Sequence, residues 1–550
     1  MATTVNTAGY PLLSVILFLP GIVALFVVAL PIFIPNTFRN DLHVKLLAVV
    51  AALVDFGLAL GVLVKFAILQ NGAGAQWVFQ FSDQRSWIGS LGISYMVGVD
   101  GVSVYLVALT TMMMAIAIIA ATFMIQDRIK PFMLLMLALE TGILGVFTSN
   151  NLFLFYVFWE AMLIPMYFLL GVWGEERRVY ATMKFLIYTV FGSFLMLVGI
   201  FYLYVKAGTL NMTTPTGGGL LGYLHSHPLS SSEQILLFLA FGIAFAIKLP
   251  IFPFHTWAPT AYSESPVPVL IALAGILSKA GAFGFIRYCL PLFPQAAHDL
   301  AGMVSIFAII GILYAAGLAL VQTDIKRLVA YSSVSHMNLI ALGIFSLNST
   351  GLTGSTLQMI NHSIIISGLF IAVALITART GTRRLTEMGG MGVRWPVLMW
   401  VFFIFVLAGL DLPGLGSFFG EFLILAGVFR ANAWFASIAA LTVILAAWYM
   451  IRFFQDTMNG PVVTSPQQVA ETTPDARHSV YEFPVLQRLV NADLLSREMI
   501  LVAPLIVLTI YIGIRPSTVT SRISPTTSSE VYIVHHRAPG SSTGAIGGAR

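Results

Sequence analysis

Residues 247–257, Ile-Lys-Leu-Pro-Ile-Phe-Pro-Phe-His-Thr-Trp, form an apolar stretch that carries a lysine and is interrupted by two prolines. Proline lacks an N–H and collides with the carbonyl four residues before it, so Pro250 and Pro253 are expected to unwind a helix and free backbone carbonyls. Lys248 stands at this break. A bilayer tolerates such a break only where protein or a water-filled cavity satisfies the freed groups. The stretch therefore predicts the middle of a polar path through a membrane.

The composition is that of a polytopic membrane protein. Of the 550 residues, 58% are hydrophobic and 9% are charged, against about a quarter charged in soluble domains. The net charge of +5 is assigned to cytoplasmic loops, since no basic run with interleaved aromatic residues indicates nucleic-acid binding. The single cysteine, Cys289, excludes an internal disulfide. No phosphate-binding loop, dinucleotide fingerprint, metal-ligand motif or nucleophile triad is found, so we expect no cofactor or metal on this chain.

Spans of about 20 apolar residues predict an all-α fold with about fourteen transmembrane helices. The aromatic and polar stretch 70–100 favours an interfacial strand pair or short helix over a span. Three helices fill residues 1–130, and two five-helix blocks fill 131–290 and 300–455. A cytoplasmic connector with an amphipathic end (456–498), a last helix (499–515) and a disordered tail (516–550) follow. The predicted helices are 11–34, 44–69, 101–125, 131–149, 152–172, 179–206, 234–257, 262–290, 300–321, 326–347, 354–379, 396–429, 432–455 and 499–515.

The two five-helix blocks resemble each other. Lys248 precedes Pro250 by two residues, and Asp411 precedes Pro413 by two, each in the fourth helix of its block. Because five is odd, successive blocks have opposite topology. Two broken helices at matching positions are typical of inverted-repeat transporters with their path at the membrane midplane. Proline is common in membrane helices, so coincidence stays an alternative.

Lysine and arginine predict the orientation, because loops rich in them stay in the cytoplasm. Loops after odd-numbered helices carry most of them, whereas loops after even-numbered helices hold little beyond Arg85, Lys206, Arg287 and Arg430. Both termini are therefore predicted to lie outside.

Four ionisable residues stand inside apolar runs, namely Glu160, Lys248, Lys279 and Glu421. Each costs a few kcal/mol at a bilayer centre, so each requires a reason. In the functional interpretation, lysines bind and release a proton while carboxylates tune them. A Glu–Lys pair about 7 Å apart at an effective dielectric constant of about 20 interacts by about 2.4 kcal/mol, enough to switch a lysine between loaded and empty. The alternative is a set of static ion pairs that fix helix register.

Five further residues are weaker candidates. His255, His336 and His362 are either hydrogen-bonded packing residues or water-linked bridges between the lysine sites. Glu140 is either a relay residue or the partner of a neighbour. Asp411 is either part of the path or a structural cap of unwound backbone.

These residues carry a resemblance to the antiporter-like membrane subunits of respiratory complex I. The similarity covers residues from about 90 to 515, and its motifs are specific in combination, although each is shared with Mrp-type sodium/proton antiporter subunits. Glu421, where related subunits carry a lysine, indicates the M type of the NADH:quinone oxidoreductase. The motifs are the runs 151–165, 248–257, 323–336 and 412–422.

The resemblance implies a proton-translocating subunit of a bacterial inner membrane, driven by quinone reduction elsewhere in the complex. It implies that Glu160 pairs with Lys248, that Lys279 links the input side to the centre, and that Glu421 belongs to the exit side. It places FMN, iron–sulfur clusters and quinone on other subunits. Neighbouring antiporter-like subunits and phospholipid are the implied partners. A Mrp-type cation/proton antiporter subunit is the alternative.

Departures from the family pattern concentrate after the first break. Where the family commonly reads Leu-Pro-Asp-Ala-His, residues 258–262 read Ala-Pro-Thr-Ala-Tyr, so Thr260 and Tyr262 replace two ionisable groups. Asn151 stands where an aspartate is common, and Phe283 where a tyrosine often follows the Lys279 motif. Two interpretations stay open: a local rerouting through Tyr262 or water, or a somewhat divergent pump.

Overall fold

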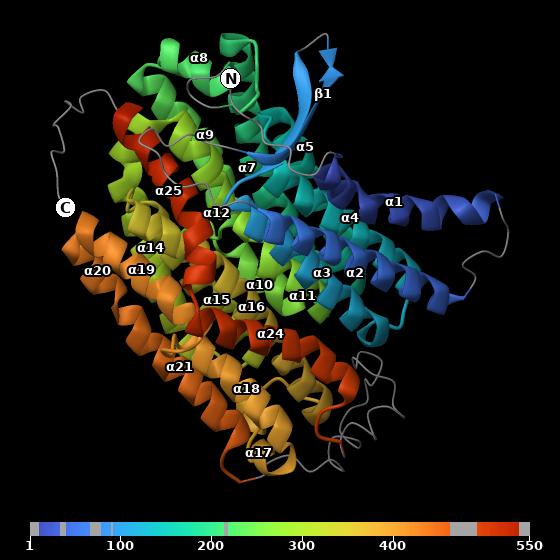
Figure 1. The fold of residues 1–550 in the computed structure, drawn as a ribbon. Coiled ribbons are helices and arrows are strands. Elements are labelled where there is room, and N and C mark those ends of the chain that lie inside the picture. Colours follow the sequence, from blue (N-terminus) through green and yellow to red (C-terminus); the bar gives the residue numbers. More distant parts are fainter. Residues whose placement is uncertain are drawn as a thin grey trace.

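The chain is a bundle of long helices with one two-stranded sheet at its edge (Figure 1). Twelve helices in the described part of the chain are long and apolar enough to cross a membrane. The all-α polytopic class is therefore confirmed, whereas the count of fourteen stays a prediction. The computed structural model describes residues 10–33, 40–66, 79–89, 92–213, 218–461 and 492–537.

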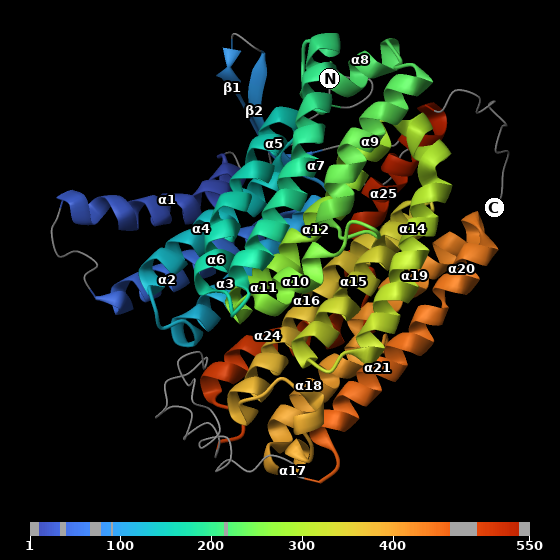
Figure 2. The ribbon, with the colours of Figure 1, turned by 180° about the vertical axis from the view of Figure 1, so that it is seen from behind.

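Three helices and a hairpin precede the first five-helix block. The antiparallel strands pair Gln80 with Val99 and Ser86 with Ser94, so of the two alternatives predicted for 70–100, a strand pair or a short helix, the structure has the strand pair. The hairpin projects at the same end of the bundle as α8 (Leu220–Ser226), and α17 (Met391–Arg394) lies at the opposite end in both views (Figures 1 and 2). The elements are α1 (Leu12–Phe33), α2 (Asp41–Lys65), β1 (Gln80–Ile88), β2 (Ile93–Val99) and α3 (Ser103–Met124).

The first block contains the broken helix that the prolines predict. Its helix α9 ends at Lys248, and α10 resumes at Trp257. Two five-residue π-helical segments interrupt the following helix on either side of α12. The elements are α4 (Ile129–Thr148), α5 (Leu152–Ala161), α6 (Leu163–Trp173), α7 (Arg178–Ala207), α8, α9 (Ser231–Lys248), α10 (Trp257–Glu264), α11 (Val267–Ala272), η2 (Leu273–Leu277), α12 (Lys279–Gly284), η3 (Phe285–Cys289) and α13 (Leu290–Leu292).

The second block has its break at the matching position, between Gly409 and Gly416. Both interruptions therefore fall where the sequence predicts them; the inverted symmetry of the blocks stays a prediction. The elements are α14 (Pro294–Val321), α15 (Ile325–Ile344), α16 (Ser349–Thr380), η4 (Leu385–Glu387), α17, α18 (Pro396–Gly409), α19 (Gly416–Ala431), α20 (Ala433–Ala439) and α21 (Leu441–Met458).

Side chains from other helices satisfy the backbone groups at the first break. The Asn338 amide nitrogen donates to the carbonyl of Pro250 at 3.1 Å, and its oxygen accepts from the N–H of Phe252 at 3.2 Å. The Trp257 indole donates to the carbonyl of Ile247 at 2.8 Å. An unpaired buried backbone group costs about 1–3 kcal/mol, so these partners make the interrupted helix stable.

The second break is held in the same way, by α16. The Asn361 amide donates to the carbonyl of Gly416 at 2.5 Å, and the Gln358 amide donates to the Ser417 hydroxyl at 2.7 Å. Asp411 adopts the left-handed conformation, with φ of 61°, which is uncommon outside glycine but tolerated by aspartate.

The described C-terminal part contradicts the predicted disordered tail (516–550) over residues 517–537. Helix α24 (Ser496–Ile514) is followed by α25 (Ser517–Arg537), which packs against α14 and α16 and is seen at the red end of the colour bar (Figure 1). Val519, Ile523 and Val534 are buried in this contact. Tertiary burial therefore overrides the low helix propensity of a Ser- and Thr-rich segment. Residues 538–550, and the predicted amphipathic end of the connector up to 491, lie outside the described residues.

Candidate functional site

Lys279 begins a buried chain of polar side chains in the middle of the bundle. It begins α12 directly after the π-helical segment η2, and local π-helix is frequent at functional sites. Its side chain is fully buried. Nζ donates to the carbonyl of Ala274 at 2.7 Å and to the Ser278 hydroxyl at 3.3 Å. A third hydrogen bond, of 2.8 Å, joins Nζ to Nδ1 of His362 on α16.

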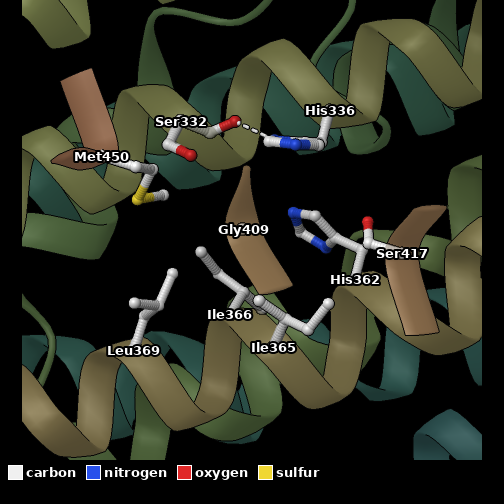
Figure 3. Close-up of a pocket in the computed structure, with 9 residues that line it drawn as sticks. All are labelled: Ser332, His336, His362, Ile365, Ile366, Leu369, Gly409, Ser417 and Met450. Carbon is white, nitrogen blue, oxygen red and sulfur yellow. Dashed lines mark hydrogen bonds between the residues drawn. The ribbon is translucent and has the colours of Figure 1, made fainter. Parts of the chain in front are cut away.

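His362 continues the chain toward His336 on α15. The two ring centroids lie 5.9 Å apart, and Figure 3 shows both rings facing one small cavity. Its volume of about 10 Å³ is enough for about one water molecule. Ser332 and Ser417 add hydroxyls to the wall. A single water would therefore connect the two imidazoles.

Beyond His336 the chain reaches two carboxylates of the second broken helix. His336 Nδ1 forms a 2.9 Å hydrogen bond with the carbonyl of Ser332, and Nε2 lies 3.6 Å from Asp411 Oδ2. His336, Asp411 and Glu421 each place one ring nitrogen or carboxylate oxygen within 4.8 Å of the other two. All three residues are buried. Lys279, His362, His336, Asp411 and Glu421 thus form one continuous set of titratable groups.

Lys248 and Glu160 form a second site at the first break. Lys248 is 1% exposed, and its Nζ has no hydrogen-bond partner among the described residues. It lies 5.2 Å from the ring centroid of Trp159 and 5.4 Å from that of Phe185. Glu160, on α5, interacts with it electrostatically, although no Glu160–Lys248 contact within 4 Å appears among the described residues. The structure therefore brings the two together as charges, not as a closed ion pair.

The two sites approach each other where α12 packs against α9. A side chain at Gly281 would stand 2.5 Å from the carbonyl of Phe245 and 2.6 Å from the N–H of Leu249, so glycine permits this close contact. Tyr262 is fully buried nearby, with its ring 6.1 Å from that of Trp257. Its hydroxyl interacts with Ser278, without a hydrogen bond of normal geometry.

Two predicted residues lie apart from this chain. His255 is in the first break, where its ring packs against Phe252 and Tyr314 at centroid distances of 5.6 and 5.5 Å. Glu140, on α4, faces Asp55 of α2, and both residues are fully buried. Asp55 escaped the sequence prediction, although an aspartate in the middle of an apolar run was the available signal.

A half-buried carboxylate, Glu175, lies in a loop outside the predicted spans. Glu175 accepts from Lys326 Nζ at 2.5 Å and from Arg383 Nη1 at 2.6 Å. Burial raises the pKa of the Glu175 carboxyl, but the charges of Lys326 and Arg383 outweigh it, so the pKa lies below its ordinary value. This cluster is an ion-pair clamp with no link to the buried chain among the described residues.

Comparisons with known proteins identify this architecture. A family model described as NADH:quinone oxidoreductase/Mrp antiporter, TM, matches residues 149–446. NADH-quinone oxidoreductase subunit M of Rickettsia prowazekii (strain Madrid E) is 36% identical over 509 residues, covering 92% of this chain and 96% of the relative. The subunit M of Rhodobacter capsulatus is 37% identical over 499 residues, covering 90% and 92%.

Solved structures of related complexes contain chains with the same fold. A chain of respiratory complex I from Thermus thermophilus with bound NADH has a TM-score of 0.79 at 26% identity, covering 95% of this chain and 99% of that one. A chain of the Mrp complex from Dietzia sp. DQ12-45-1b shares the fold, with a TM-score of 0.76 at 18% identity over 95% and 99%. The chain therefore belongs to the NADH:quinone oxidoreductase/Mrp antiporter family of membrane subunits, and within it to subunit M of the NADH-quinone oxidoreductase, respiratory complex I.

Proposed function

We propose that this subunit moves protons across a bacterial inner membrane through its buried lysine, histidine and carboxylate side chains. The observation that carries the proposal is the close succession of buried titratable groups from Lys279, hydrogen-bonded to His362, through His336 to Asp411 and Glu421. Packing alone has no need of such a set, because each ionisable group costs free energy in an apolar interior.

Each site has a distinct role in this proposal. Lys248 is loaded with a proton and is tuned by Glu160, whose charge favours the ammonium form while burial favours the amine. Lys279 receives the proton and passes it to His362. Glu421, with Asp411, receives it at the exit side. His255 and Glu140 are secondary, since neither contacts this chain among the described residues.

The transfer needs an external driving force. Subunit M works within a complex of several membrane subunits, and its neighbours include other antiporter-like subunits. FMN, the iron–sulfur clusters and quinone are assigned to other subunits, so quinone reduction there drives this chain electrostatically. Protons enter from the cytoplasm, and both termini lie outside, as the positive-inside rule indicates.

The test is proton pumping by the assembled complex in sealed vesicles with NADH and quinone. Lys248→Ala and Glu160→Ala are expected to lower pumping through this subunit by about 10²-fold or more, the range of a lost proton-transfer group. Lys206→Ala is the matched control, because Lys206 pairs with Glu233 at a half-exposed helix end, 2.8 Å away. Normal proton-to-electron stoichiometry in a fully assembled Lys248→Ala complex would refute the proposal.

The same vesicles separate the alternatives. Sodium-dependent proton exchange without NADH would identify a Mrp-type antiporter. Altered assembly of a Lys248→Met variant with unchanged proton stoichiometry would identify a static ion-pair role.

A further inference from the structure

The strongest unexplained feature is the cluster of His336, Asp411 and Glu421. These residues come from α15, from the second break and from α19, so no sequence spacing reveals them. They are 8%, 7% and 3% exposed. Asp411 interacts with Glu421, His336 and Ser417, but no hydrogen bond of normal geometry reaches either carboxylate among the described residues. Two carboxylates buried side by side cannot both carry a charge at low cost, so the cluster requires a cation, either a proton or a metal ion.

The hydrogen bonding of His336 sharpens this requirement. Nδ1 pairs with the carbonyl oxygen of Ser332 at 2.9 Å, and a carbonyl only accepts, so Nδ1 carries a hydrogen. In the neutral ring, Nε2 then presents a lone pair to Asp411 Oδ2, 3.6 Å away. Two hydrogen-bond acceptors, His336 Nε2 and Asp411 Oδ2, would then face each other. The space between the three side chains is therefore shaped for a cation, either a proton or a metal ion.

We propose that this cluster is a binding site for a divalent transition-metal ion of the Zn²⁺ class. Imidazole nitrogen and carboxylate oxygen are both ligands of Zn²⁺, whereas Mg²⁺ and Ca²⁺ prefer oxygen ligands alone. The two carboxylates neutralise the ion. The Nδ1–H bond to a backbone carbonyl is the outer contact that typically fixes a metal-binding histidine with Nε2 free.

The geometry requires only a small contraction. The three donor atoms lie within 4.8 Å of one another, and ligands about 2.1 Å from a tetrahedral zinc are about 3.4 Å apart. The adjoining cavity, lined by His336 and Ser417, has room for about one water, which is the fourth ligand. Asp411 is held in the left-handed conformation, a backbone cost that proteins typically retain at functional sites.

The consequence rests on the proposed function. A metal ion bound here would occupy Nε2 of His336 and both carboxylates, which are the groups that receive the proton from His362. Zn²⁺ would therefore inhibit pumping by blocking the exit half of the chain, with the Lys248 site untouched.

The test measures metal binding directly on the complete purified complex. Radioactive Zn²⁺ is titrated by equilibrium dialysis, and Co²⁺ is used as a visible-absorption probe of coordination. His336→Gln and Glu421→Gln are expected to bind one Zn²⁺ fewer than the unmodified complex, or to bind that ion at least 10-fold more weakly. Glu421→His keeps a ligand and is expected to retain the ion and the tetrahedral Co²⁺ spectrum, which excludes misfolding as the cause of the losses.

The matched control is His298→Gln, since His298 forms an exposed pair with Asp299 at 3.7 Å and represents adventitious surface binding. Equal Zn²⁺ stoichiometry and affinity in His336→Gln and in the unmodified complex would overturn the metal site. Lys248→Ala is expected to bind Zn²⁺ normally. If that variant also pumps normally, the proposed function fails while the metal site stands on its binding data.

Discussion

The buried Asp and Glu side chains are of two kinds: some accept hydrogen bonds from neighbouring donors, and others have no such donor among the described residues. Asp100 accepts from Arg287 Nη2 at 2.5 Å, and both side chains are 2% exposed. It also accepts from the N–H groups of Val102 and Ser103. Asp55 and Glu140 are equally buried, but none of their carboxylate oxygens has a hydrogen-bond partner among the described residues. Two such carboxylates facing each other cannot both ionise at low cost.

This difference predicts opposite effects of one substitution. Asp55→Asn replaces a buried carboxyl group that has no hydrogen-bond donor with a neutral amide, so the free energy of unfolding is expected to change by less than about 1 kcal/mol or to rise. Asp100→Asn leaves Arg287 charged and buried, which is expected to cost about 3 kcal/mol. The two variants are compared by the thermal midpoint of the purified complex, with release of this subunit as the signal. Similar losses of stability in both would show that Asp55 has a donor that the structure does not reveal.

The candidate site was largely predictable at this scale, because one rule finds it: a charge inside an apolar run must have a purpose. That rule identified Lys248, Lys279 and Glu421. Applied to every run, it would also have found Asp55. Arg287 was counted among the loop charges, but it is buried in η3. The sequence did not reveal this burial, because the ion-pair partner of Arg287 lies 187 residues away. Long-range partners leave no trace in local composition.

At the scale of elements, the broken helices are the part that the sequence predicts best. Pro250 and Pro413 predict the two breaks. The gap between α9 and α10 and the gap between α18 and α19 confirm them. The side chains that hydrogen-bond the backbone at the breaks could not be predicted, because Asn338 and Asn361 belong to other helices. Asn338 also packs tightly, since a side chain at Gly311 of α14 would stand 2.2 Å from its amide oxygen.

Replacement of this asparagine should loosen the first break. Asn338→Leu is expected to leave the carbonyl of Pro250 and the N–H of Phe252 without their partner, at a cost of about 2–6 kcal/mol for the two backbone groups. Ser335→Ala on the same helix removes one hydroxyl, which donates to Ile312 at 3.0 Å, and should cost less. Hydrogen–deuterium exchange of residues 249–256 measures the opening. Unchanged exchange there in Asn338→Leu would contradict the assigned role of Asn338.

The tail shows where composition misleads. A segment rich in Ser and Thr predicts disorder when taken alone, yet α25 packs along α14 and α16. The Thr527 and Thr353 hydroxyls are 2.7 Å apart, and the Gly101 N–H donates to Thr526 at 3.1 Å. Polar side chains buried against polar partners are invisible to a hydrophobic pattern, so only the tertiary structure reveals this helix.

Across the whole molecule, ion pairs join segments that are distant in the sequence. Asp100–Arg287 ties the start of α3 to the first block. Arg379–Glu498, at 2.6 Å and fully buried, ties the second block to α24. Glu175 ties the two blocks together, because it lies between α6 and α7 while Lys326 and Arg383 belong to the second block. The blocks that surround the buried chain are thus fastened at several points around it.

The Glu175 clamp predicts a pH-dependent contribution to stability. Its carboxyl has a lowered pKa in the folded chain, so its contribution is complete above the ordinary glutamate range and is lost as pH falls through the lowered value. At pH 7, Glu175→Gln is expected to cost about 1–2 kcal/mol, discounted for a side chain that is 39% exposed. Glu176→Gln, at the exposed neighbouring position, should cost nothing measurable. The thermal midpoints of the three complexes, measured at pH 7 and at falling pH, should draw together below the ordinary glutamate range and converge once the pH passes below the lowered pKa of Glu175, because the protonated carboxyl no longer holds Lys326 and Arg383. A Glu175→Gln deficit that persists undiminished under acid conditions would mean that the clamp acts by shape and not by charge.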